Sequence, residues 1–219
     1  MAVKQFDLVV WDWDGTIADS TGMITQALIR AAEETGLPPL TAEKVRGIIG
    51  LGLRESIHAL YGDIPQTMAQ DLATAYHRRY YAGENEIVLF AGIAETIAAL
   101  ARRGCKQAVA TGKGRRGLDA ALANTGLGRY FSATKTVDEC FSKPHPQMLD
   151  ELMDELVVMP HRTLMIGDSQ YDIQMGQNAD VNTAAVSYGS QTAAQLQQYS
   201  PGQLFQDVAT LRHWLLEQV

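Results

Sequence analysis

The sequence predicts an α/β protein in which a parallel sheet carries helices on both faces and an all-helical insertion follows the first strand. Two observations predict this fold class. Short apolar runs alternate with helical patterns from about residue 87 onward, and such alternation is typical of a parallel sheet covered on both sides. A long helical stretch separates the first apolar run from that second half. We therefore expect a Rossmann-like core of residues 1–16 and 87–219 and a helical cap of residues 17–86.

The first half of the chain predicts one strand followed only by helices. The apolar run over residues 6–11 predicts a buried strand. A helix over residues 23–34 follows, and Ser20 is among its candidate caps. Thr41 can cap a helical stretch over residues 41–81, which glycine and proline interrupt. Those interruptions fall at residues 50–52, 62–63 and 65.

The second half predicts alternating strands and helices. Glycine follows several of the helical patterns, and Pro146 stands at the start of one, where proline is tolerated. Asp207 can cap the last helix. The predicted strands cover residues 105–110, 132–137, 163–166 and 183–186. The predicted helices cover residues 92–103, 115–124, 146–157, 171–178 and 207–217, with a surface helix near 191–198.

Composition excludes several classes of partner and location. The 219 residues include 46% hydrophobic and 20% charged residues, with a formal charge of −7. An acidic chain lacks the basic face that nucleic acids and anionic membranes require, so we expect neither as a partner. Cys105 and Cys140 show no metal-binding spacing, and no signal peptide or apolar span is present. These features predict a cytoplasmic protein with reduced thiols, and the sequence does not decide between a monomer and a homodimer.

Polar side chains follow four of the predicted strands, at the point where each strand ends. Asp12 and Asp14 follow the first, Thr111 and Gly112 the second, Lys143 the third, and Asp168 and Asp172 the fourth. In an open parallel sheet, ligands bind at the carboxyl ends of the strands. We therefore expect these residues, which are far apart in the sequence, to meet at one edge of the sheet.

These residue types suit the transfer of a phosphoryl group. The carboxylates of Asp12, Asp14, Asp168 and Asp172 offer the hard oxygen ligands that Mg²⁺ prefers. Thr111 and Lys143 can donate to phosphate oxygens. The electrostatic repulsion between a carboxylate and a nearby phosphate is on the order of 4 kcal/mol per unit charge. A metal ion and a lysine offset this repulsion. The sequence therefore predicts a Mg²⁺ site next to a phosphate site.

The four motifs resemble those of the haloacid dehalogenase superfamily. They are residues 12–16 (Asp-Trp-Asp-Gly-Thr), Thr111-Gly112, the Lys143-Pro144 pair, and residues 167–172 (Gly-Asp-Ser-Gln-Tyr-Asp). They occur in the family's order, with a helical insertion between the first two. Within the superfamily the chain is similar to the phosphoglycolate phosphatase and β-phosphoglucomutase-like group. Trp at positions 11 and 13 departs from the Phe or Leu that members often carry, and each indole brings an N–H that needs an acceptor.

The resemblance implies a role for each residue. Asp12 would be the nucleophile that forms an aspartyl-phosphate, and Asp14 the acid and then the base. Thr111, Gly112 and Lys143 would bind the phosphoryl group. Mg²⁺ would be held by Asp12, by Asp168 and by the backbone carbonyl of Asp14. Asp172 would support the metal from the same loop as Asp168.

Several other residues lie near the motifs or in the predicted cap. Residues 50–52 predict a turn between cap helices, and Arg54 after it is the candidate to reach the leaving group. We expect Lys113 and its basic neighbours Arg115 and Arg116 to form a solvated helix start. His58 and His77 are expected to be ordinary polar positions on helices.

The implied activity is that of a Mg²⁺-dependent phosphatase acting on a small phosphorylated metabolite such as phosphoglycolate or a sugar phosphate. A phosphomutase would use the same Asp12 chemistry while excluding water, and the sequence does not separate the two. A phospho-accepting receiver-like signalling domain is a different class, but receivers are much shorter and lack the helical insertion. A metal-free dehalogenase has no need of the paired metal site. A phosphonate hydrolase would need a cap lysine, for which only Lys44 is available.

Overall fold

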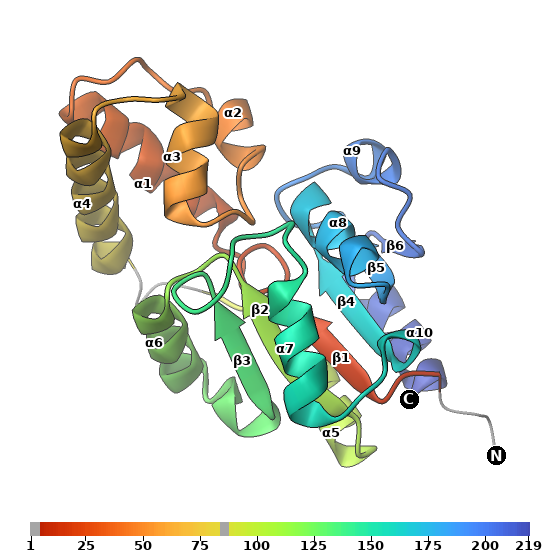
Figure 1. The fold of residues 1–219 in the computed structure, drawn as a ribbon. Helices are drawn as coiled ribbons and strands as arrows, with labels where there is room; N and C mark the ends of the chain where they lie inside the picture. Colours follow the sequence, from red (N-terminus) through yellow and green to blue (C-terminus); the bar gives the residue numbers. More distant parts are fainter. Residues whose placement is uncertain (1–4, 84–87) are drawn as a thin grey trace.

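The protein, described here from a computed structural model over residues 5–83 and 88–219, is built on a six-stranded parallel sheet in the order β3-β2-β1-β4-β5-β6 (Figure 1). All five neighbouring strand pairs of the sheet run parallel. The strands are β1 (Leu8–Trp11), β2 (Lys106–Thr111), β3 (Ala133–Thr136), β4 (Thr163–Gly167), β5 (Asn182–Val186) and β6 (Gln203–Phe205). The predicted fold class is therefore confirmed, with one additional strand.

Side chains of β1 alternate between two apolar cores, one on each face of the sheet. Val9 and Trp11 pack with α5 (Ile93–Arg102), α6 (Arg115–Thr125) and α10 (Val208–Gln218) on one face. Leu8 and Val10 pack on the other face with α7 (Gln147–Leu156) and α8 (Gln170–Asn178). A short helix, α9 (Ala193–Gln197), follows β5. Because both faces are covered, β1 is apolar at every position.

The central strand β1 lies between β2 and β4, so the chain order reverses around it. Ligands bind at such a switch point, beyond the carboxyl ends of the strands. The backbone N–H of Asp12 donates to the carbonyl of Ile166 at 2.9 Å, which extends the ladder one residue past β1. This bond fixes the direction in which the chain leaves the sheet.

The helical insert, as we call the described residues 17–83, stands over the carboxyl end of the sheet (Figure 1). It consists of α1 (Thr21–Glu34), α2 (Ala42–Arg46), α3 (Leu53–Tyr61) and α4 (Gln66–Gly83). Buried Leu28, Val45, Ile57 and Leu72 form an apolar core of its own. The predicted boundary between cap and core, at residues 86 and 87, lies outside the described residues.

Two helix caps agree with the expectation from the sequence, and a third differs from it. Thr41 accepts from the backbone N–H of Lys44, and Asp207 accepts from that of Thr210, as expected. At α1, the Ser20 hydroxyl instead donates to the Asp14 carboxylate at 2.7 Å, and the helix begins two residues before the predicted start. The Ser20 side chain therefore binds Asp14 at the edge of the sheet and does not cap α1.

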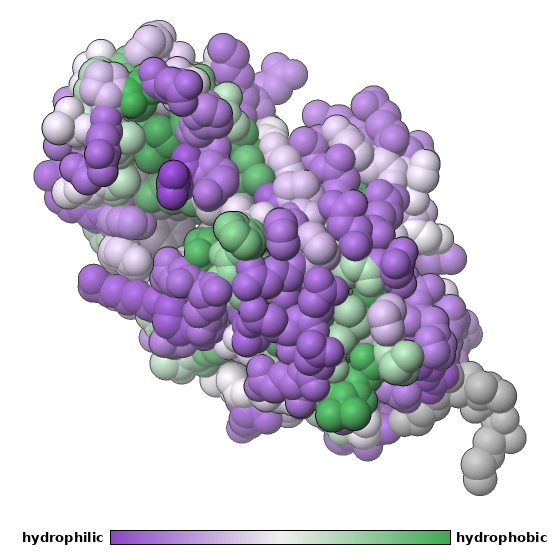
Figure 2. Space-filling model, in the orientation of Figure 1, coloured by the Kyte–Doolittle hydropathy of each residue, from purple (hydrophilic) through white to green (hydrophobic). Residues whose placement is uncertain are grey.

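The loop between α2 and α3 packs directly on the core. A Cβ atom on Gly112 would lie 2.6 Å from the carbonyl oxygen of Gly50 and 2.5 Å from that of Leu51. The Tyr171 hydroxyl donates to the Gly47 carbonyl at 3.1 Å. Beside this contact the surface is hollowed between insert and core, with apolar residues visible at its edge (Figure 2). None of the helices, over the residues described, combines the length and apolarity needed to cross a membrane.

Candidate active site

Three buried carboxylates lie together at the carboxyl ends of β1 and β4. Oxygen atoms of Asp12, Asp168 and Asp172 all lie within 4.8 Å of one another. Asp12 follows β1, while Asp168 and Asp172 come from the loop after β4 and the first turn of α8. Because β1 and β4 are hydrogen-bonded neighbours, the sheet itself brings these residues together. We call them the acidic cluster.

Lys143 is the cation that lies in the acidic cluster. Its side chain comes from the loop between β3 and α7 and is fully buried. Its ammonium donates to Asp12 Oδ1 at 2.6 Å and to Asp172 Oδ1 at 2.5 Å. Burial opposes the charge, but the two carboxylates outweigh it and raise the pKa of Lys143. Lys143 is therefore charged, and one positive charge faces three carboxyl groups.

The acidic cluster retains an excess of negative charge. Burial raises the pKa of Asp12 well above its ordinary value, and burial and the neighbouring Asp172 raise that of Asp168 to about 7. Among the described residues, Asp12 Oδ2 is buried with no hydrogen-bond partner. A divalent cation would neutralise this excess, and an all-carboxylate donor set suits Mg²⁺. The residues present therefore fit a Mg²⁺ ion.

Asp168 is held in place by donors and by close-packed glycines. Thr16 Oγ1 donates to its Oδ1 at 3.3 Å, and the Ser190 backbone N–H donates to its Oδ2 at 2.5 Å. A Cβ atom on Gly15 or on Gly189 would lie 2.2 or 2.3 Å from Asp168 Oδ2. Gly15 also has a φ of +87°, which L side chains rarely adopt. Both positions therefore require glycine.

Both carboxylate oxygens of Asp172 accept hydrogen bonds. Its Oδ1 accepts from Lys143, while its Oδ2 accepts from the Ser169 backbone N–H at 3.1 Å and from the Ser169 hydroxyl at 2.6 Å. This is a capping box at the start of α8, with Ser169 as the N-cap. With both oxygens engaged, Asp172 is suited to hold Lys143 rather than to bind a ligand itself.

Thr111 and Gly112 lie at the end of β2, beside the seam with the insert. Thr111 is buried, and its Oγ1 accepts from the Lys113 backbone N–H at 3.1 Å. Gly112 lies directly under the Gly50 and Leu51 carbonyls. The structure thus brings the predicted Thr111 and Gly112 to the same edge as Asp12.

Lys113 corrects one expectation drawn from the sequence. It is buried instead of solvated, and its ammonium lies 3.2 Å from Asp14 Oδ2. The ammonium also bonds the Tyr80 hydroxyl and lies 4.4 Å from the centre of that ring. Arg115 and Arg116 do stay near the surface, where Arg115 pairs with Asp119 and Glu139. Lys113 therefore links the insert to Asp14.

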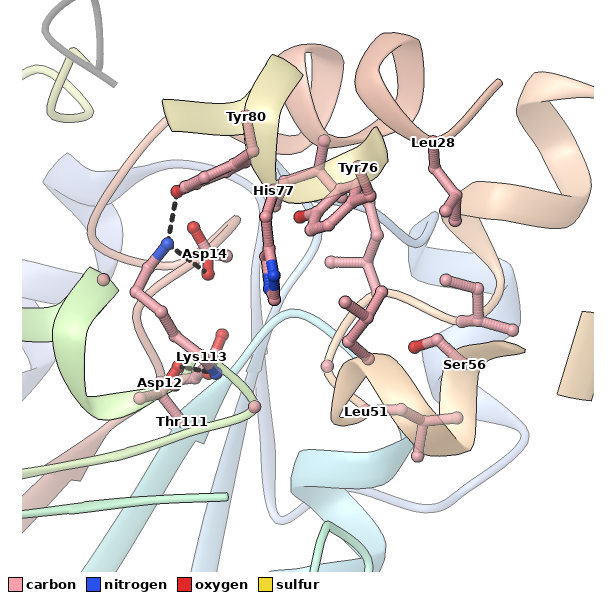
Figure 3. Close-up of a pocket in the computed structure, with 18 of the residues that line it drawn as sticks. Asp12, Asp14, Leu28, Leu51, Ser56, Tyr76, His77, Tyr80, Thr111 and Lys113 are labelled. Carbon is pink, nitrogen blue, oxygen red and sulfur yellow. Dashed lines mark hydrogen bonds and ion pairs between the residues drawn. The ribbon is translucent and has the colours of Figure 1, made fainter. Parts of the chain in front are cut away.

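A cavity of about 90 Å³ opens between the insert and the edge of the sheet, with space for several water-sized groups. Asp12, Asp14 and Thr111 line its core side (Figure 3). Tyr76, His77 and Tyr80 line it from α4, and the His77 ring projects into the space between them and the core (Figure 3). Ser56 and Leu51 complete it from the side of α3.

Two expectations for the insert differ from what the structure shows. Arg54 is exposed and is not among the described residues that line the cavity. Leu53 and Ser56, three residues apart on α3, face the cavity, and Arg54 between them points elsewhere. His77, expected to be an ordinary polar position, does line the cavity, and partial burial lowers its pKa. His58 stays exposed and pairs with Asp63.

The two unusual tryptophans flank Asp12 in the sequence and pack in the apolar core on one face of the sheet. Trp11 Nε1 donates to Gln107 Oε1 at 3.2 Å, and Gln107 in turn donates to the Ile97 carbonyl at 2.9 Å. Trp13 is fully buried, and its Nε1 has no acceptor within the described part of the chain. The extra N–H is satisfied in one indole and left unpaired in the other.

Comparison with known proteins agrees with this geometry. A family model described as haloacid dehalogenase-like hydrolase matches residues 9–186. A pyrophosphatase PpaX of Bacillus cereus (strain B4264) is 29% identical over 199 residues, covering 90% of each chain. A pyrophosphatase PpaX of Bacillus mycoides (strain KBAB4) is 27% identical over 209 residues, covering 94% of this chain and 95% of the relative.

Solved structures share the fold over nearly the whole length. A hydrolase from Pseudomonas syringae matches with a TM-score of 0.89 at 20% identity, covering 96% of this chain and 98% of that one. A predicted phosphoglycolate phosphatase from Haemophilus somnus 129PT matches with a TM-score of 0.83 at 23% identity, covering 97% and 99%. At this level of identity the likeness shows the fold.

Proposed function

We propose, because the chain belongs to the haloacid dehalogenase-like hydrolase family, that it is a Mg²⁺-dependent phosphatase that hydrolyses a small phosphate monoester through an aspartyl-phosphate. One observation carries the proposal. Lys143 binds Asp12 Oδ1 at 2.6 Å, while the buried Oδ2 has no partner among the described residues. A carboxylate that is oriented on one oxygen and open on the other is suited to attack.

In the first step an Asp12 oxygen attacks the phosphorus atom, and the bond from phosphorus to the ester oxygen breaks. Asp14 donates a proton to the departing alcohol. In the second step Asp14 takes a proton from water, the water oxygen attacks the phosphorus atom, and inorganic phosphate leaves Asp12. The position of Asp14 supports this role, because Ser20 and Lys113 hold its carboxylate at 2.7 and 3.2 Å beside the cavity.

Positive charge and donors surround the phosphoryl group in this proposal. Mg²⁺, when bound, supplies charge that stabilises the phosphoryl oxygens. Asp12, Asp168 and the backbone carbonyl of Asp14 would hold it. Thr111 and Gly112 bind phosphoryl oxygens, Lys143 orients Asp12 and adds its charge, and Asp172 keeps Lys143 in place.

The proposed division of labour follows the chain. Residues 1–16 and 87–219 form the catalytic core, and residues 17–86 form a cap over it. The separate apolar core of the helical insert supports this division. Relatives named for pyrophosphate and phosphoglycolate support a small phosphorylated substrate, and the modest volume of the cavity agrees with one.

The test is phosphate release from 4-nitrophenyl phosphate with Mg²⁺. Asp12→Asn should lower kcat on the order of a thousandfold or more, since it removes the nucleophile. Asp19→Asn is the matched control, because Asp19 is an exposed aspartate near the same loop. After an acid quench, mass spectrometry should find one phosphoryl group on Asp12 in the parent protein.

Chelation of Mg²⁺ should stop turnover, and added Mg²⁺ should restore it. Full activity of Asp12→Asn, or unchanged activity after chelation with EDTA, would contradict the proposed mechanism.

A further inference from the structure

The helical insert contributes no cation to the cavity. All its lysines and arginines are exposed, and none is among the described residues that line the cavity. They are Arg30, Lys44, Arg46, Arg54, Arg78 and Arg79. Arg78 and Arg79 both pair with Glu34 at the end of α1, and Arg30 pairs with Glu33. The basic residues of the insert therefore lie outside the described lining of the cavity.

What the insert does present to the cavity is uncharged. Aliphatic side chains such as Leu28 and Ile49 form much of the wall. The polar side-chain groups among them are the hydroxyls of Ser56, Tyr76, Tyr80 and Tyr81 and the ring of His77. Within the described residues the Ser56 and Tyr76 hydroxyls have no hydrogen-bond partner (Figure 3). Partial burial lowers the pKa of His77, which favours the neutral form of its ring.

The two lysines of the core near the cavity are already engaged. Lys113 is the one cation among the described lining residues, and it pairs with Asp14. Lys143 lies deeper and binds Asp12 and Asp172. Arg116 is not among the described lining residues, and its guanidinium lies over the Tyr81 ring, 4.7 Å from the ring centre. A second anionic group on a substrate would therefore find no unengaged cation among those lining residues and would face the carboxylate of Asp14. Burying such a charge without a partner is costly.

We infer that this cavity selects phosphate monoesters of uncharged alcohols, and discriminates against substrates whose leaving group carries a carboxylate or a second phosphate. The inference rests on the proposed phosphatase function and specifies its substrate class. It separates this chain from relatives named for pyrophosphate and phosphoglycolate, since both those compounds carry a second charged group. The free hydroxyls and the aliphatic wall suit an alcohol with hydroxyl or amide groups beside apolar surface.

The sharpest test compares 2-phosphoglycolate with its amide, 2-phosphoglycolamide. The two esters have almost the same size and differ in the charge of the leaving group. Competition against 4-nitrophenyl phosphate gives the relative kcat/KM of both, and we expect the amide to be favoured at least about tenfold. Equal values, or a preference for 2-phosphoglycolate, would overturn the inference.

A second test adds the missing cation. His77→Lys places an ammonium on the cavity wall at a position exposed enough to tolerate the change. It should shift the preference toward 2-phosphoglycolate by about tenfold, because the carboxylate gains a partner. His58→Lys is the control, since His58 is an exposed histidine on α3 outside the described cavity lining. An equal shift in both variants would contradict the inference.

Failure of the inference can be told apart from failure of the proposed function. Turnover of 4-nitrophenyl phosphate that depends on Mg²⁺ and Asp12, together with a preference for the anionic ester, overturns only the substrate class. Absence of that turnover overturns both.

Discussion

The two sides of the cavity are built in opposite ways. The core side is an edge of parallel strands where buried charges are held by short hydrogen bonds, and Gly15 and Gly189 leave Asp168 no room to move. The side of the helical insert is neutral, formed by aromatic and aliphatic residues on α1, α3 and α4. The contrast agrees with our proposals that the core carries out the reaction and that the insert selects the substrate.

Loss of the buried lysine should have the largest effect. Lys143→Met leaves three buried carboxyl groups without a cation, so the metal-free variant should lose about 3–5 kcal/mol of stability. Urea unfolding measures this, and Mg²⁺ should restore part of the loss. Lys135→Met is the control, because Lys135 forms a partly exposed ion pair with Glu151 and should cost less than about 1 kcal/mol. Equal losses in the two variants would contradict a charged core side.

The pH dependence of stability should reveal the buried carboxyl groups of the same cluster. Burial and Asp172 raise the pKa of Asp168 from 3.8 to about 7, so the folded protein holds a proton that the unfolded chain releases. Without metal, Asp168 should therefore lower stability as pH rises from about 4 to about 7, by on the order of 2–4 kcal/mol. Unfolding measured across this range should show a smaller loss for Asp168→Asn. Mg²⁺ should also reduce the loss, and parallel curves for the two proteins would contradict the prediction.

Crowding around Asp168 should affect metal binding. A Cβ atom added by Gly189→Ala would lie 2.3 Å from Asp168 Oδ2, so the carboxylate must move. Mg²⁺ affinity measured by calorimetry should fall about 10–100-fold. Gly22→Ala is the control, since a Cβ there meets nothing within 4 Å. If Gly189→Ala binds Mg²⁺ as tightly as Gly22→Ala does, the acidic cluster is not the metal site.

Loss of the Tyr80–Lys113 link between insert and core should have the smallest effect. Tyr80→Phe removes the hydroxyl that bonds Lys113 and keeps the ring. One hydrogen bond contributes about 1 kcal/mol, so we expect KM for 4-nitrophenyl phosphate to change by about fivefold or less, with little change in kcat. Tyr61→Phe removes a hydroxyl that bonds Pro38 within the insert and should leave KM unchanged. A large loss of kcat in Tyr80→Phe would place Tyr80 on the reacting side of the cavity.

The functional residues on the core side of the cavity could be predicted from the sequence because they follow strands. Asp12, Thr111 and Asp168 stand at strand ends, and the parallel sheet brings strand ends together. Lys113 could not be predicted in the same way. It is buried because Tyr80, 33 residues earlier, packs over it, and no local pattern encodes that contact.

The same limit applies to the insert and to the edge of the sheet. The sequence favours Arg54 as a cavity residue because it is a cation close to a turn. Only the rotation of α3 determines that Ser56 faces the cavity instead. Strand β6 has three residues after Pro201-Gly202, too few to show an alternating pattern. Short elements and contacts between distant helices depend on packing of the whole chain.

The seam at Gly112 has an evolutionary consequence. Gly50 and Leu51 rest on Gly112 through their main-chain carbonyls, and every residue type has a carbonyl. Side chains of the insert can therefore be exchanged without altering this particular contact, as long as position 112 stays glycine. New specificities can arise in the lining of the cavity while this main-chain contact with Gly112 stays in place.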